Sequence, residues 1–329
     1  GLGCRRVLIR CGEKGAEQRR KDGFSLDEYF YRCKVVYGRE LDEDLYKSWL
    51  YAGHVSQAPN PGDFFQYELG EDAIIITRDP KGEIHALMNT CRHRGSRVCE
   101  AASGNSKLFT CPYHGWVYNL DGSLRAARSM ELKDGFDPKD YGLRHARVTV
   151  YEGLIFINCD LNAADFLPAL EAIADTLTPY DLGSAKVAHR QIYKVAANWK
   201  LVVENYLECY HCAPAHRAYA KLHTLQELDE RVAHLNRAMR DRAEEQTGVP
   251  GIVLTGVSET TSTQSEVYAS TAALGGCAQS SRYALYDGFV TGSESGQPVA
   301  PLMGKFTGYD GGAGDFQLGP LAFMLNYPD

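Results

Sequence analysis

The sequence predicts an α+β protein in which a small all-β domain lies between helical segments. Three observations lead to this fold class. Within residues 50–160, short β-rich runs are separated by turn residues, as in strands joined by hairpins. Residues 23–49 and 198–213, on either side, carry apolar residues at helical spacing. Residues 1–22 show no periodicity, and we expect a disordered or non-native tail there.

The first structured segment is expected to form N-terminal helices that pack on the domain beginning at residue 161. Ser25 and Glu28 have the spacing of a capping box, in which each side chain bonds the other's backbone. Leu41, Leu45 and Trp49 recur every four residues, so we expect one amphipathic helix there.

The all-β region begins with three strand-like runs, FFQYELG, AIIITRD and EIHALMN, of which the last two are joined by the turn DPKGE. A second turn signal, residues 119–122, follows Val117 and Tyr118. The run RVTVYEGLIFIN predicts two closing strands around Gly153.

Beyond residue 160 the pattern becomes helical again. Asp165 and Pro168 are expected to open a helix that Pro179 ends. The run KVAHRQIYKV, residues 186–195, predicts a strand, and residues 198–213 predict a second helix.

Four metal-binding side chains lie in the stretch CRHRGSRVCEAASGNSKLFTCPYHGW. They form two pairs, Cys91 with His93 and Cys111 with His114, with seventeen residues between the pairs. Two Cys and two His fit a tetrahedral zinc ion. They also fit a [2Fe–2S] cluster in which two His replace two Cys on one iron.

Three features favour the cluster over a structural zinc knuckle. Each pair mixes Cys with His, whereas zinc fingers usually group Cys with Cys and His with His. Gly95 and Gly115 allow the backbone to turn closely around a bulky group. Pro112 and Trp116 would stiffen and cover the second loop. Cys99 is off the pattern and is expected to be a packed free thiol.

A second histidine pair, His211 and His216, lies near the end of the predicted helix 198–213. On an unbroken helix a five-residue step would leave the two side chains about 140° apart. Pro214 disfavours helical geometry at the residue before it, so a break between the histidines would let them face one ion. Two imidazoles and one carboxylate form the facial triad of non-heme Fe(II) oxygenases. Two partly buried structural histidines are the alternative.

The first block, CRHRGSRVC followed by CPYHGW, resembles the Rieske motif of the ring-hydroxylating and demethylating non-heme iron oxygenases. The resemblance implies that Cys91 and Cys111 bind one iron of a [2Fe–2S] cluster, and that His93 and His114 bind the other. It also implies a Rieske domain at residues 50–160, inserted before a helix-grip, START-like α+β catalytic domain at residues 161–329.

The stretch NWKLVVENYLECYHCAPAH resembles the second signature of this family, Glu-x-x-His-x4-His or Asp-x-x-His-x4-His after Asn-Trp. By this resemblance His211 and His216 bind a mononuclear Fe(II). Glu208 takes the place of the carboxylate that bridges one subunit's cluster to its neighbour's iron, which implies a homotrimer. Glu rather than Asp is closer to the branch that acts on carnitine and betaines.

The family's third iron ligand is an Asp on a late helix. Asp310, Asp315 and Asp329 are candidates only because they are acidic. We expect instead that the sequence is truncated within the catalytic domain and that the ligand lies beyond Asp329.

Composition limits the partners and the compartment. The formal charge of −7 disfavours nucleic acid, and no apolar run approaches the roughly 20 residues that span a bilayer. The ten cysteines show no disulfide spacing, which favours the cytoplasm. No Gly-rich dinucleotide fingerprint is present, so we expect an NAD(P)H-dependent reductase of flavin or ferredoxin type as a separate partner.

The sequence therefore predicts an oxidoreductase, the oxygenase component that uses O2 to hydroxylate or N-demethylate a small molecule such as a betaine-type amine. An aromatic ring-hydroxylating dioxygenase large subunit is the alternative. Two further classes stay open: an electron-transfer Rieske protein with an inactive second domain, and a zinc-stabilised binding module.

Overall fold

The computed structural model describes most of the first 222 residues and short stretches beyond them. The described residues are 25–206, apart from 131–132 and 172–173, then 211–222, and later pieces that include 269–270, 279–283, 315–318 and 325–327. They divide into two compact units. One comprises Leu41–Ala164 with Gly183–Gln191, and the other Gly1–Glu40, Asp165–Leu182 and Ile192–Asp329.

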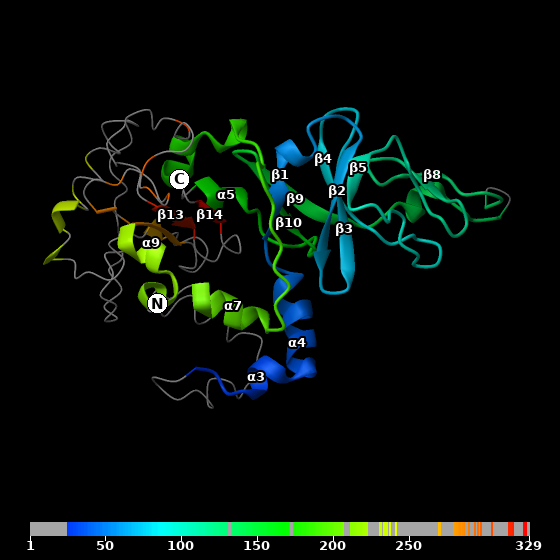
Figure 1. Cartoon of the computed structure of the whole chain (residues 1–329). Coiled ribbons are helices and arrows are strands. Elements are labelled where there is room, and N and C mark those ends of the chain that lie inside the picture. Colours follow the sequence, from blue (N-terminus) through cyan, green and yellow to red (C-terminus); the bar gives the residue numbers. More distant parts are fainter. Residues whose placement is uncertain are drawn as a thin grey trace. The chain divides into compact units, whose positions relative to one another are not determined.

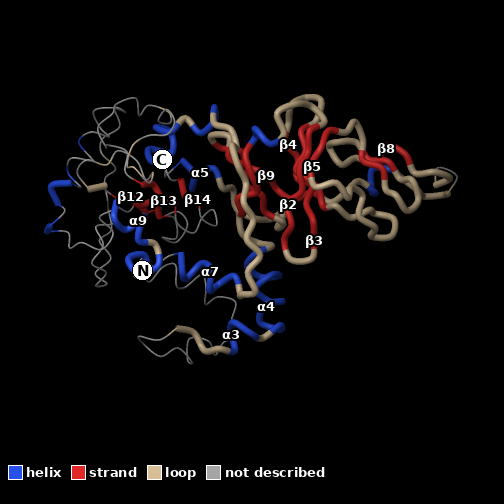
Figure 2. The backbone as a smooth tube through the Cα atoms, in the orientation of Figure 1, coloured by secondary structure: helices blue, strands red, loops and turns tan. Residues whose placement is uncertain are grey.

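The first unit is built on an antiparallel seven-stranded sheet in the order β1-β10-β9-β4-β3-β2-β5 (Figures 1 and 2). A three-stranded sheet, β6-β7-β8, accompanies it. The bounds are β1 Leu50–His54, β2 Asp63–Leu69, β3 Asp72–Arg78, β4 Ile84–Met88, β5 Ser103–Asn105, β6 Phe109–Thr110, β7 Val117–Tyr118, β8 Leu124–Ala126, β9 His145–Tyr151 and β10 Leu154–Asn158.

Strand β3 separates two hydrophobic cores. Its residues from Ala73 to Thr77 are all buried, although neighbouring side chains of a strand point to opposite faces. Ile75 packs into the core that also holds Cys91 and Cys111. Ile74 and Ile76 pack into the other core, with side chains of β1 and β10. Both faces of the sheet are therefore covered, which explains the uninterrupted apolar run in the sequence.

The predicted hairpins of this unit are confirmed. Arg78 pairs with Ile84 across the DPKGE turn, where Gly82 has φ +89°. The Asp79 carboxylate closes that turn by accepting from the backbone N–H groups of Lys81 (2.8 Å) and Glu83 (2.9 Å). Strands β9 and β10 form the closing pair.

The second unit contains helices and a separate four-stranded sheet, β11-β12-β13-β14. Its described elements are α3 Tyr29–Arg32, α4 Lys34–Glu40, α5 Leu167–Glu171, α6 Ala174–Leu177, α7 Trp199–Tyr206, α8 Cys212–Ala215, α9 Arg217–Leu222, β11 Ala269–Ser270, β12 Gln279–Tyr283, β13 Asp315–Leu318 and β14 Leu325–Tyr327. None of the described helices combines the length and apolar character needed to cross a bilayer.

The capping-box prediction is wrong. Helix α3 begins after Glu28, which makes no side-chain cap. The carboxylate of Asp27 instead accepts from the backbone N–H of Tyr29 at 2.9 Å. The residues of the predicted box lie too early for the helix that forms.

Two further element predictions are also wrong. The helix expected through Trp49 ends earlier: a π-helical turn spans Leu41–Leu45, and the Trp49 indole N–H donates to the carbonyl of Ala164 at 3.0 Å. Residues 186–195 form no strand. Their apolar side chains are exposed, and no strand among the described residues pairs with them.

A buried ion pair joins α4 to α7 inside the second unit. Lys200 Nζ lies 2.6 and 2.7 Å from the two carboxylate oxygens of Glu40, and the two residues are 1% and 2% exposed. The Trp199 indole N–H donates to the same carboxylate at 3.1 Å. With neither charge in contact with water, each depends on the other for compensation.

Replacing Glu40 by Gln is therefore expected to cost about 3–5 kcal/mol of unfolding free energy, because it leaves the Lys200 charge buried and uncompensated. The double variant Glu40→Leu/Lys200→Met should recover most of the loss. Denaturant unfolding measures both. The exposed pair of Glu43 with Lys47 is the control: Glu43→Gln should change stability by less than about 1 kcal/mol. A similar loss in both single variants would contradict the assignment.

Candidate metal centres

The first ligand loop turns tightly around Cys91. The backbone N–H of Cys91 donates to the carbonyl of Ser96 at 2.9 Å, and the N–H of Gly95 donates to the carbonyl of Cys91 at 3.0 Å. Gly95 has φ +76°, a conformation that costs glycine little and other residues more. His93 lies inside this turn.

The second ligand loop repeats the same backbone pattern. Cys111 N–H donates to the carbonyl of Trp116 at 2.8 Å, and Gly115 N–H donates to the carbonyl of Cys111 at 3.0 Å. Gly115 has φ +70°. The two loops thus share one fold around their cysteines, and each glycine serves the turn as the sequence predicted.

The two loops bring like ligands together. Nδ1 of His93 lies 3.2 Å from Nδ1 of His114, with ring centroids 4.4 Å apart. Cys91 and Cys111 are both buried, with their side chains in the same core. The site therefore has a buried sulfur end and a more exposed imidazole end.

The protonation of the ligands suits metal binding at the imidazole end. Partial burial, followed by the nearby charges of His114 and Arg94, lowers the pKa of His93. Its ring is therefore neutral near pH 7, the form that binds a metal. Burial raises the pKa of the Cys91 thiol, and Cys111 adds to the rise, so bound iron would have to displace that proton.

The spacing of the four ligands favours two metal ions over one. A tetrahedral zinc ion with bonds of about 2.0–2.3 Å would hold all its donor atoms within roughly 4 Å of one another. Among the described residues, only Asp79, Glu83 and His85 bring three such atoms within 4.8 Å. The two Cys and two His therefore do not converge on one point. Two irons bridged by sulfide, one at each end, fit this arrangement.

Two aromatic residues border the site, and the sequence did not single out one of them, Tyr118. Its hydroxyl lies 3.2 Å from Cys91 Sγ and accepts from the backbone N–H of Arg92 at 3.1 Å. The hydroxyl hydrogen is thus available to the sulfur. Trp116 stacks on the His93 ring, with centroids 5.0 Å apart and 6° between planes, and covers the site as predicted.

The structure also brings His211 and His216 together. Their ring centroids are 5.2 Å apart at 76°. One helical turn, α8, lies between them, and His216 leaves helical geometry with φ −120° and ψ 59°. Two imidazoles held this way could share one ion.

The local structure of this segment differs from the prediction. No single helix spans residues 198–213, because Asn198 and His211 lie outside the described helices; α7 covers Trp199–Tyr206, and residues 207–210 are outside the described part of the chain. Pro214 lies within α8, and the residue before it, Ala213, is helical as well. The break falls at His216 instead. Its N–H closes the turn by donating to the carbonyl of Cys212 at 2.8 Å.

Only one of the four candidate carboxylates, Asp315, lies among the described residues. Glu208, Asp310 and Asp329 lie outside the described residues, and Asp315 begins β13. The bridging role of Glu208 and the third iron ligand stay predictions.

Comparisons with known families match both parts of the chain. Residues 48–136 match the family described as the Rieske [2Fe-2S] domain. Residues 182–278 match the ring hydroxylating alpha subunit (catalytic domain). The order of the two domains confirms the predicted fold class, and their identities confirm the predicted cluster and mononuclear iron.

Curated relatives include glycine betaine monooxygenase oxygenase subunit of Pseudomonas aeruginosa (strain UCBPP-PA14), 40% identical over 64% of this chain and 48% of the relative. Carnitine monooxygenase oxygenase subunit of Acinetobacter pittii (strain PHEA-2) is 34% identical over 60% of this chain and 54% of the relative. Biphenyl 2,3-dioxygenase subunit alpha of Rhodococcus jostii (strain RHA1) is 38% identical over 56% of this chain and 42% of the relative.

Among solved structures, the quaternary ammonium Rieske monooxygenase CntA in complex with L-carnitine is 35% identical, with a TM-score of 0.54 over 58% of this chain and 55% of that chain. The chain spans about half the length of the curated relatives it matches. Its residues 48–136 therefore belong to the Rieske [2Fe-2S] domain family, and its residues 182–278 to the ring hydroxylating alpha subunit catalytic domain family.

Proposed function

We propose that this chain serves as the oxygenase component of a Rieske oxygenase that hydroxylates or N-demethylates a small quaternary ammonium compound of the betaine type. The observation that carries the proposal is the presence, in one chain, of two matched Cys–His loops and a separate pair of facing imidazoles. The first arrangement suits electron transfer and the second suits oxygen chemistry.

In this proposal Cys91 and Cys111 hold one iron of the cluster, and His93 and His114 hold the other. When bound, the cluster supplies single electrons and the mononuclear iron supplies the site of O2 activation. The protein's own part is to bury the sulfur end and to keep the His93 imidazole neutral. Trp116 limits water at His93 by stacking on its ring.

His211 and His216 are proposed to hold the mononuclear iron. Glu208 is proposed to relay electrons to it from the cluster of a neighbouring subunit, within a homotrimer. The third ligand is proposed to be an Asp. The short helix α8 supports the histidine assignment, because it fixes both ends of the pair through backbone hydrogen bonds.

The substrate class rests on the relatives named for glycine betaine and carnitine, together with Glu at position 208. An aromatic ring-hydroxylating dioxygenase is the second candidate, because a biphenyl dioxygenase alpha subunit is nearly as similar. An electron carrier with an inactive second domain is the candidate from another class.

The electron donor is proposed to be an NAD(P)H-dependent reductase of flavin or ferredoxin type, on a separate chain. The proposed compartment is the cytoplasm. Cys91 and Cys111 are free thiols in one core, and an oxidising compartment would favour a disulfide over the cluster.

The protein, supplied with O2, NADH and a matching reductase, is expected to release formaldehyde from glycine betaine or a related methylammonium compound. His211→Ala and His216→Ala should keep the visible absorption of the cluster and lose formaldehyde release, because each removes one ligand of the second site only. A formaldehyde assay and an absorption spectrum measure this. Dihydroxylation of aromatic substrates without formaldehyde would instead support the second candidate, and reduction without O2 uptake would support the electron carrier.

Tyr118→Phe is expected to lower the midpoint potential of the cluster. The phenol hydrogen bond to Cys91 Sγ stabilises the reduced, more negative cluster, and the variant removes it without removing the ring. A redox titration followed by absorption or EPR measures the shift. Tyr141→Phe is the control, since Tyr141 packs its ring on Trp116. Equal potentials in Tyr118→Phe and the unmodified protein would contradict this role.

A further inference from the structure

The two ligand loops share one turn but are closed differently at their base. The second loop joins paired strands, because Phe109 faces Tyr118 and Thr110 faces Val117 in an antiparallel ladder. The first loop follows β4, which pairs with β3 and β9, and leads to β5, which pairs with β2. The strands on either side of the first loop therefore do not pair with each other.

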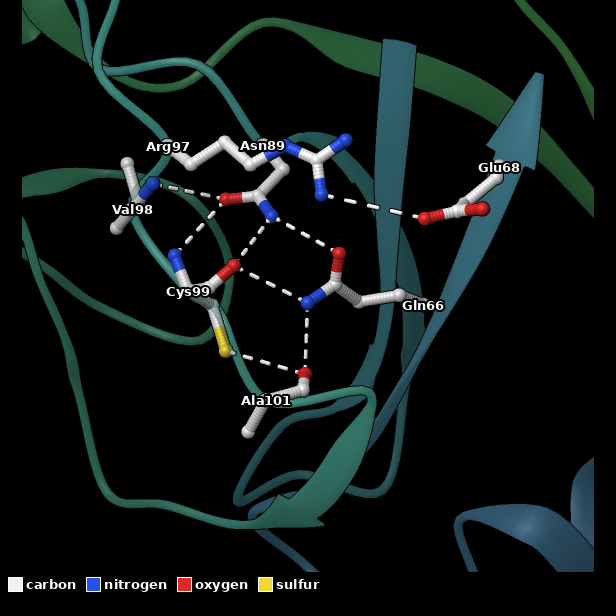
Figure 3. A network of polar contacts seen from close by, with 7 residues as sticks. All are labelled: Gln66, Glu68, Asn89, Arg97, Val98, Cys99 and Ala101. Atoms are coloured by element: carbon white, nitrogen blue, oxygen red, sulfur yellow. Dashed lines mark hydrogen bonds and ion pairs between the residues drawn. The ribbon is translucent and has the colours of Figure 1, made fainter. Parts of the chain in front are cut away.

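The side chain of Asn89 closes the first loop instead (Figure 3). Its Oδ1 accepts from the backbone N–H groups of Val98 and Cys99, each at 2.9 Å. Its Nδ2 donates to the carbonyl of Cys99 at 2.6 Å. Asn89 stands just before the ligand turn and is 2% exposed, so one buried amide bridges the two arms of the loop.

A second amide, Gln66 of β2, fastens this bridge to the sheet. Gln66 Oε1 accepts from Asn89 Nδ2 at 3.1 Å. Gln66 Nε2 donates to the carbonyls of Cys99 at 3.1 Å and Ala101 at 2.6 Å. Figure 3 shows the two amides side by side, with the arm from Val98 to Ala101 held against them. The returning arm of the loop is thus fixed to the central strands.

The chemistry of the bridge requires an amide at position 89. An Asn side chain offers two acceptor lone pairs and two N–H donors, and here all four are used. A carboxylate would keep the acceptors and lose the donors. An apolar residue would leave the Val98 and Cys99 N–H groups without this partner in a buried setting, which is costly. Val98 itself packs in the core that holds Cys91 and Cys111.

We propose that Asn89, supported by Gln66, is the positioning residue for the first ligand loop, and that it holds Cys91 and His93 at the distance from the second loop that the [2Fe–2S] cluster requires. In the described part of the chain, neither amide forms a hydrogen bond to a ligand atom. The effect passes through the backbone of residues 98–101. This inference rests on the cluster and not on oxygenase activity, so the two can fail separately.

The test compares variants of the cluster-loaded protein by two readouts, the rate of iron release to a chelator and the reduced-state EPR spectrum. Asn89→Leu is expected to release iron at least fivefold faster and to give a broadened, shifted EPR signal, because the first loop would adopt several positions. Gln66→Met, which keeps the side-chain length and loses the hydrogen bonds, should change both readouts in the same direction by less.

Two controls separate positioning from general instability. Asn105→Leu removes an exposed amide that donates to Pro61 and Asp63 in the same unit. Ile157→Ala weakens the other core and should lower the melting temperature. Both are expected to keep the iron-release rate and the EPR signal.

Unchanged release and EPR in a folded Asn89→Leu variant would overturn the proposal. So would changes of the same size in Ile157→Ala. If Asn89→Leu does not fold, Gln66→Met decides: unchanged readouts there overturn the proposal, and faster release with an altered signal supports it.

Discussion

Everything at the cluster site depends on one repeated backbone interaction, the hydrogen bond from a cysteine N–H to the carbonyl five residues later. It occurs at Cys91 and again at Cys111. Each bond folds its loop so that the sulfur points into the core while the histidine stays nearer the surface. Because both loops use the same turn, sulfur meets sulfur and nitrogen meets nitrogen. The polarity of the centre follows from this repetition.

The sheet then supplies the packing and the hydrogen bonds that hold the two ligand loops in place. Its central strand, β3, contributes Ile75 to the core around the thiols and keeps the other core apart. Tyr118 reaches Cys91 from β7, and the amides of Asn89 and Gln66 hold the loop that lacks a hairpin. These contacts tie the ligand loops to the sheet. The imidazole end remains the less covered side of the centre.

The sequence was informative where local chemistry decides the structure. The paired Cys–His spacing and the turn glycines predicted the cluster loops, and the DPKGE turn predicted its hairpin. The sequence was less informative where contacts between residues far apart in the chain decide the structure. Trp49 lies outside the helix and donates a hydrogen bond to the carbonyl of Ala164, and the periodicity of the sequence does not predict that contact. In the sequence, Tyr118 looks like an ordinary strand residue and Asn89 like the end of a strand. Their hydrogen-bond partners are set by the register of the sheet, which local sequence does not reveal. The sequence predicts the end of helical geometry at Pro214, whereas it falls at His216, because proline is tolerated in the first turn of a helix.

The buried thiols have a consequence for how the centre is first assembled. Burial raises the pKa of Cys91, so without a bound metal its sulfur is protonated near pH 7. Soft metal ions and oxidants attack thiolates far more readily than thiols. Any metal that binds at Cys91, iron included, must therefore displace this proton first.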